Sequence, residues 1–122
     1  MTRLSIRIDF EPEGVLGPGM MELLERVAQH GSIRQAAVSM QMSYRKAWLL
    51  IQTMGETFGG AVVDTTTGGA DGGGARLTPL GRTLVQSYRR LGVRAARAAE
   101  GELKTLSALV RAPARKPGKT KA

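Results

Sequence analysis

The chain has 122 residues, of which 18 are lysine or arginine and 10 are aspartate or glutamate, giving a formal net charge of +8 at pH 7. This length accommodates one domain with a modest core, and the positive charge favours a polyanionic partner. The absence of cysteine excludes disulfides, thiolate chemistry and cysteine-based metal sites. No stretch approaches the ~20 apolar residues of a membrane span, and no leader-like apolar run opens the chain. We therefore expect a cytoplasmic protein without a membrane partner.

The positive charge is concentrated near the C-terminus. Residues 111–122 contain five lysines and arginines and no acidic residue, whereas the preceding residues carry only a small basic excess. The composition of residues 113–122 is typical of a disordered basic tail. We therefore expect one folded domain over residues 1–112, followed by a tail that accounts for part of the high isoelectric point.

The first thirty residues predict a strand, a loop and a helix. Apolar and polar residues alternate from Leu4 to Phe10, which predicts a strand with one buried face. Residues 11–19 contain two prolines and three glycines, which predict a loop. Apolar residues then recur at helical spacing from Gly19 or Met20 until Gly31, a residue that favours a left-handed helix end. The apolar positions of this helix are Met20, Met21, Leu24, Val27 and Ala28.

Two short helices joined by a tight turn are predicted over residues 32–54. Ser32, with Gln35 three residues later, forms the capping-box pattern of a helix start, and Ser43 is placed to cap the next helix. The apolar side of the first helix consists of Ile33, Ala36, Ala37 and Met40. Because small alanine side chains let two helices cross closely, this segment is predicted to form a helix-turn-helix pair.

The second helix of this pair has a core face and an outward face. Its predicted core residues are Ala47, Leu50, Ile51 and Met54. Arg45, Leu49 and Gln52 lie on the opposite side of the helical wheel. Tyr44 and Trp48 stand on the flank, and we interpret them as a packing pair beside the core. Donation from the Tyr44 hydroxyl to a phosphate is the alternative.

A glycine-rich hairpin and a long helix complete the predicted fold. Residues 61–63 and 75–77 predict two strands, and the intervening TTTGGADGGG suits a hairpin tip. Thr78 caps the next helix, with Pro79 at its first position. The apolar stripe of this helix, starting with Leu80, Leu84, Tyr88 and Leu91, continues to Val110, with Gly92 and Gly101 as weak points.

The far end of this stripe has nothing left in the chain to pack against, which favours a second copy of the chain. The predicted fold class is therefore mainly α with a small β-hairpin (α+β). Specifically, it is a winged helix-turn-helix with a long C-terminal dimerisation helix.

Basic residues at the helix starts indicate DNA binding. Arg45 and Lys46 lie where the recognition helix of such a pair reaches base edges, and arginine can pair with guanine. Arg34, at the start of the preceding helix, is placed for the phosphate backbone. The alternative is that these residues are solvated charges on exposed helices.

Nothing in the sequence indicates an enzyme. The glycine tract lacks the lysine and the serine or threonine that end a Walker A loop. His30 is the single histidine and stands at a helix end, where it is expected to meet terminal carbonyls rather than bind metal. No nucleophile–base pair or close acidic pair is evident, so we expect no catalytic residue, metal or cofactor.

The segments GSIRQAAVSMQMSYRKAW and TTTGGADGGGARLTPLGRTLVQSY resemble the N-terminal DNA-binding domain of the ModE family of molybdate-responsive regulators. The resemblance rests on MSYRKAW, on TGG and GGGA in the wing and on LTPLG. It implies a homodimeric transcription regulator that binds double-stranded DNA, with a winged helix distantly related to the LysR type. By position, it implies that residues 43–46 face DNA and that the wing lies along the backbone. The candidate DNA-binding residues are Ser32, Arg34, Ser43, Tyr44, Arg45, Lys46, Leu49, Gln52, Gly68, Gly69, Gly72, Gly73 and Arg76.

The chain departs from the family pattern in two respects. Full-length members continue into molybdate-binding domains, whereas this chain ends at Ala122, so we expect no oxyanion site in it and a separate effector-sensing protein as a further partner. The family wing often carries a lysine, but here Ala70 and Asp71 stand among the glycines, and residues 49–75 contain no basic residue. This leaves Arg76 and backbone amides for wing contacts. It also keeps open an alternative, a winged-helix interaction or dimerisation module with only nonspecific nucleic-acid affinity.

Overall fold

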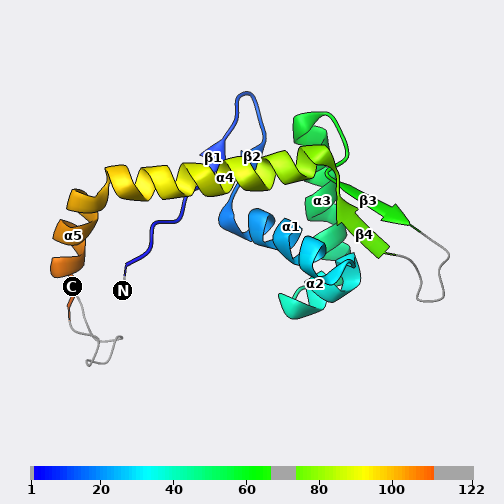
Figure 1. The fold of residues 1–122 in the computed structure, drawn as a ribbon, viewed down its shortest axis with the longest axis horizontal. Coiled ribbons are helices and arrows are strands. Elements are labelled where there is room, and N and C mark those ends of the chain that lie inside the picture. The colour runs from blue at the N-terminus through cyan, green and yellow to red at the C-terminus, as the bar shows by residue number, and fades with distance from the viewer. Residues whose placement is uncertain (1, 67–73, 112–122) are drawn as a thin grey trace.

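The computed structural model describes residues 2–66 and 74–111. In chain order the elements are β1 (Ile8–Asp9), β2 (Val15–Leu16), α1 (Pro18–His30), α2 (Ile33–Ser39), α3 (Tyr44–Phe58), β3 (Val63–Thr66), β4 (Gly74–Leu77), α4 (Pro79–Ala98) and α5 (Glu100–Ala108). The helices α1–α3 and the β3–β4 hairpin form one end of the molecule, and α4 extends from there into an arm that ends in α5 (Figure 1). Among these described helices, none combines the length and apolarity needed to cross a membrane.

Helix α1 lies at the centre of the core and contacts α2, α3, α4 and β4. Its completely buried side chains are Leu23, Leu24 and Val27. Because neighbours pack on more than one side of α1, its buried face differs from the predicted stripe. Leu23 joins the core, whereas Ala28 is exposed. Gly31 follows the helix with a φ of 68°, the left-handed conformation predicted for it.

The N-terminal strand is shorter than predicted and has an unexpected partner. Only Ile8–Asp9 form β1, which pairs antiparallel with β2 so that Ile8 lies opposite Leu16. Strand β2 lies within the segment predicted to be a loop. The chain before β1 contacts the arm instead. The Tyr88 hydroxyl donates to the Ile6 carbonyl, and the hydroxyls of Thr2 and Ser107 are hydrogen-bonded to each other. Contact with helices, rather than a longer sheet, therefore organises the first residues.

Thr78 fixes the junction between the hairpin and α4. Its hydroxyl accepts a hydrogen bond from the Gly81 N–H (3.0 Å) and donates one to the Ala61 carbonyl (2.7 Å). Its own N–H donates to the Val62 carbonyl at 3.0 Å. Thr78 thus binds the carbonyl groups of both Ala61 and Val62. Strand β3 begins only at Val63, whereas a strand was predicted over residues 61–63. The predicted start of α4 is confirmed.

Replacing Thr78 with valine should lower the free energy of unfolding by about 2 kcal/mol, because the cap and the bond to Ala61 are lost together. Thr78→Ser retains the hydroxyl and is the matched control. Urea unfolding followed by circular dichroism measures the difference. A valine variant as stable as the wild type, with a loss of stability only in Thr78→Ser, would show that the methyl group, not the hydroxyl, stabilises this junction.

The predicted single C-terminal helix is wrong, because α4 ends at Ala98 and α5 begins at Glu100. The break falls at Ala99, with φ −97° and ψ 11°, and not at either of the glycines predicted as weak points. Arg97 lies in the last turn of α4, and Glu100 and Glu102 lie in the first turn of α5. Each sign of charge is where the helix dipole favours it, so these residues suit the end of one helix and the start of another. The fold class itself, a mainly α winged helix with a small β-hairpin, is confirmed.

Candidate nucleic-acid interface

Helices α2 and α3 form a closely packed pair, and a serine caps each of them. Ser32 Oγ accepts a hydrogen bond from the Gln35 N–H at 3.1 Å, and Ser43 Oγ accepts one from the Lys46 N–H at 3.0 Å. The buried alanines of the pair are Ala36, Ala37 and Ala47. Between the helices Gln41 adopts a φ of 57°, the left-handed conformation that reverses the chain in a short turn. The predicted helix-turn-helix is therefore confirmed.

The outward face of α3 carries three chemically different side chains. The buried residues on its inner face are Ala47, Ile51 and Met54. Arg45, Leu49 and Gln52 are all exposed on the other side, and Leu49 keeps 45% of its surface accessible. Their spacing covers roughly 10 Å along the helix axis, somewhat less than the width of a major groove. The structure thus brings together a guanidinium, an apolar side chain and an amide in one row.

Tyr44 and Trp48, interpreted from the sequence as a packing pair beside the core, belong neither to the core nor to the partly buried residues that pack against it. Both side chains are exposed, Tyr44 to 43% and Trp48 to 42%. The Arg34 guanidinium carbon instead lies over the Tyr44 ring, 4.6 Å from its centroid, a cation–π geometry. Because Arg34 is near the start of α2 and Tyr44 opens α3, this contact joins the first turns of the two helices.

The hairpin is connected to the helix pair through the backbone. The Ala75 N–H donates to the Gly31 carbonyl at 2.9 Å, just before α2. Arg76 is exposed on β4 and lies opposite Asp64 on β3. Opposite residues of an antiparallel pair share one face of the sheet, so a carboxylate neighbours this arginine. The candidate wing residues Gly68, Gly69, Gly72 and Gly73 lie outside the described residues.

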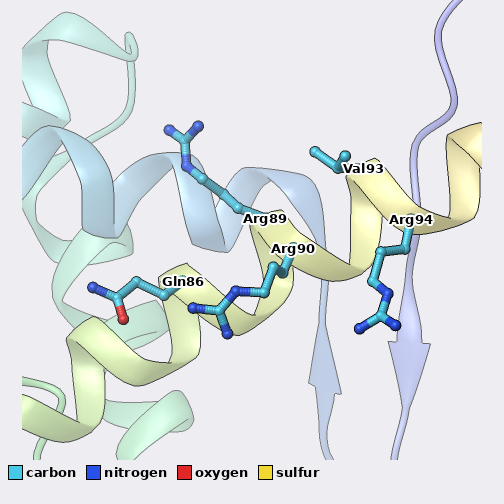
Figure 2. A pocket seen from close by; sticks show the side chains of 5 residues that line it. All are labelled: Gln86, Arg89, Arg90, Val93 and Arg94. Carbon is cyan, nitrogen blue, oxygen red and sulfur yellow. The ribbon is translucent and has the colours of Figure 1, made fainter.

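A second basic surface lies on α4, where an open groove of about 340 Å³ follows the helix. Its lining residues are Gln86, Arg89, Arg90, Val93 and Arg94. These residues recur at i, i+3, i+4, i+7 and i+8, so their side chains share one face of α4, where Figure 2 shows them. One helix supplies every lining residue, so the groove cannot enclose a small molecule as a ligand pocket does. None of these arginines is among the candidate residues predicted from the sequence, although Arg90 and Arg94 stand four residues apart.

No cluster of three or more His, Asp or Glu side chains that could hold a metal ion occurs within residues 2–66 and 74–111. His30 lies in the last turn of α1 and is exposed.

A capped helix pair with an exposed, partly basic second helix and an adjoining antiparallel hairpin defines a winged helix-turn-helix DNA-binding domain. The chain belongs to the lysR family of bacterial regulatory helix-turn-helix proteins, which residues 19–82 match. This match extends from α1 to the first turn of α4 and so includes the helix pair and the wing.

Several known proteins are similar to part of the chain. The molybdenum transport protein ModE of Herbaspirillum seropedicae is 45% identical over 69 residues, which are 57% of this chain and 26% of that protein. ModE of Azotobacter vinelandii is 36% identical over 91 residues, which are 75% of this chain and 33% of that protein. The DNA-binding transcriptional dual regulator ModE of Escherichia coli is 41% identical over 71 residues, which are 58% of this chain and 27% of that protein.

The chain therefore spans about a quarter to a third of the length of these relatives. The resemblance to the DNA-binding domain of ModE, predicted from the sequence motifs, is confirmed. The chain carries a DNA-binding domain of the LysR and ModE type.

Proposed function

We propose that this chain is a sequence-specific DNA-binding transcription regulator that acts as a homodimer. The proposal rests on the exposed face of α3, where Arg45, Leu49 and Gln52 follow the capped start of the helix. Arginine can pair with both acceptors of guanine, glutamine can pair with adenine, and an apolar side chain can contact the thymine methyl group. One helix face therefore offers three different base preferences.

The residues around this face are proposed to hold the phosphate backbone. Ser32 and Ser43 each accept one capping hydrogen bond, and a hydroxyl in this state keeps its own O–H to donate. Arg34, Lys46 and Arg76 are exposed and contribute positive charge. The wing glycines and residues 113–122 are outside the described residues. For them we propose backbone contact and nonspecific, salt-dependent affinity, respectively.

The test is the substitution of Arg45 with alanine. Preferred sites are first selected from random duplexes with the wild-type chain, and competition titrations then compare selected with random DNA. Arg45→Ala should cost about 1–3 kcal/mol on the selected site and relax base preference at one position.

Arg90→Ala, which removes an exposed arginine from α4, is the control and should leave base preference unchanged. Equal losses on selected and random duplexes in Arg45→Ala would mean that Arg45 contacts only phosphate. Such a result would remove the observation on which the proposal rests.

A winged-helix interaction or dimerisation module with nonspecific nucleic-acid affinity is the second candidate. The position of Asp64 opposite Arg76 favours it, because a carboxylate at the base of the wing opposes approach to phosphate. Selection from random duplexes that enriches no common site, while binding remains steeply salt-dependent, would favour this second candidate.

Double-stranded DNA in the cytoplasm is the proposed main partner, with no membrane partner and no enzymatic activity. A separate effector-sensing protein is a further proposed partner.

A further inference from the structure

Arg34 and Tyr44 form a defined contact between two helices. The guanidinium carbon lies 4.6 Å from the ring centroid. Arg34 is the second residue of α2 and Tyr44 is the first residue of α3, so the contact joins segments separated by the helix turn. Both side chains stand at the protein surface. Because Tyr44 is 43% exposed, it contributes little to the core, and core packing does not account for its contact with Arg34.

The ring occupies the part of the guanidinium that binds no phosphate. An aromatic ring attracts the cation through its negative face, whereas phosphate binds the N–H donors at the edge of the guanidinium plane. Within the described residues, Arg34 makes neither an ion pair nor a side-chain hydrogen bond. Its donors are thus available while its position is restricted by the contact with Tyr44.

The position of Arg34 in the fold favours phosphate over a base edge as its target. In helix-turn-helix proteins the first helix of the pair crosses the DNA backbone, while the second enters the major groove. Arg34 belongs to the first of these helices, and Tyr44 directly precedes Arg45 on the second. A phosphate held by Arg34 would therefore lie beside the bases that Arg45 is proposed to read.

We propose that Tyr44 is a positioning residue whose ring holds the Arg34 guanidinium ready for a DNA phosphate. This inference rests on the proposed DNA-binding function. The required group is the aromatic ring and not the hydroxyl, which separates this role from direct donation by Tyr44 to the backbone. Positioning before binding reduces the side-chain freedom that Arg34 loses when it contacts the phosphate.

The experiment measures how much affinity Arg34→Ala removes in four backgrounds, using duplex selected by the wild-type chain. In the wild-type and Tyr44→Phe backgrounds the loss should be the same, because both retain the ring. In the Tyr44→Leu background it should be about two- to fivefold smaller, since the contact is already absent. Trp48→Leu is the matched control, because Trp48 is an equally exposed aromatic residue one turn further along α3, and the full Arg34→Ala loss should persist there.

Two further measurements separate positioning from a general effect on structure. In the wild-type background, Arg34→Ala should reduce the slope of log affinity against log salt by about 0.9, as expected for one phosphate contact. In the free protein, nuclear magnetic resonance should show ring-current shifts of the Arg34 side chain in the wild type and in Tyr44→Phe, and not in Tyr44→Leu. This second measurement does not depend on DNA.

An undiminished Arg34→Ala loss in Tyr44→Leu would overturn the positioning role of Tyr44, even with wild-type binding intact. A reduced loss in Tyr44→Phe would assign the effect to the hydroxyl and overturn the inference as well. Failure of the wild-type chain to bind duplex would instead overturn the proposed function, and the ring-current shifts would still report whether the contact exists.

Discussion

Gly81→Ala is expected to lower the free energy of unfolding by about 3 kcal/mol or more, a large effect for the addition of a single carbon atom. A Cβ atom at this position would overlap with the Val62 carbonyl oxygen and lie 3.2 Å from its carbonyl carbon. Both are backbone atoms, so no side-chain rotation can relieve the overlap. The Val62 carbonyl also accepts the hydrogen bond from the Thr78 N–H, which ties the hairpin to the start of α4. Relief of the overlap would therefore require the wing and α4 to separate.

Gly92→Ala provides the matched control on the same helix. No heavy atom outside the local helix lies within 4 Å of a Cβ built on Gly92. Alanine should therefore stabilise α4 by about 0.5–1 kcal/mol, as expected for glycine replacement in a helix interior. Urea unfolding of both variants measures the two free energies with opposite expected signs. If Gly81→Ala were as stable as the wild type, α4 could not approach Val62 as closely as the structure has it.

The helix starts were predictable from the sequence because capping is a local interaction. Ser32, Ser43 and Thr78 each accept a hydrogen bond from the N–H three residues ahead, and no distant segment is needed. The exposure of Arg45 and Leu49 on α3 likewise followed from helical periodicity alone. These features therefore gave the helix-turn-helix and its outward face, although their contacts with DNA remain predictions.

Features that depend on distant segments were not predictable in this way. Gly81 must lack a Cβ atom because of the nearby Val62 carbonyl, and the proposed role of Tyr44 depends on its contact with Arg34. Helical periodicity indicates neither of these residue pairs. The break between α4 and α5 is a different case, because the charges around Ala99 were a local signal. The continuous apolar stripe nevertheless predicts a single helix, because apolar periodicity does not reveal where a helix bends.

The arm formed by α4 and α5 is the proposed dimer contact. No residue of α5 is buried, and Leu106 and Leu109 keep 59% and 73% of their surface accessible. Exposed apolar side chains gathered along an arm favour association with a second copy of the same arm. Light scattering at micromolar concentration should therefore give twice the chain mass of 13.0 kDa.

Leu106→Glu combined with Leu109→Glu should shift the protein to monomer, because each carboxylate would have to be buried in the dimer. Both side chains are exposed in the single chain, so the fold of each protomer should survive. Loss of the second half-site should weaken binding to a two-half-site operator by about 100-fold or more, while binding to one half-site stays nearly unchanged. Lys104→Glu introduces a carboxylate at an exposed polar position of α5 and should leave the dimer intact. A wild-type monomer with full operator affinity would contradict this arrangement, because two recognition helices could then not be held at a fixed half-site spacing by the arm.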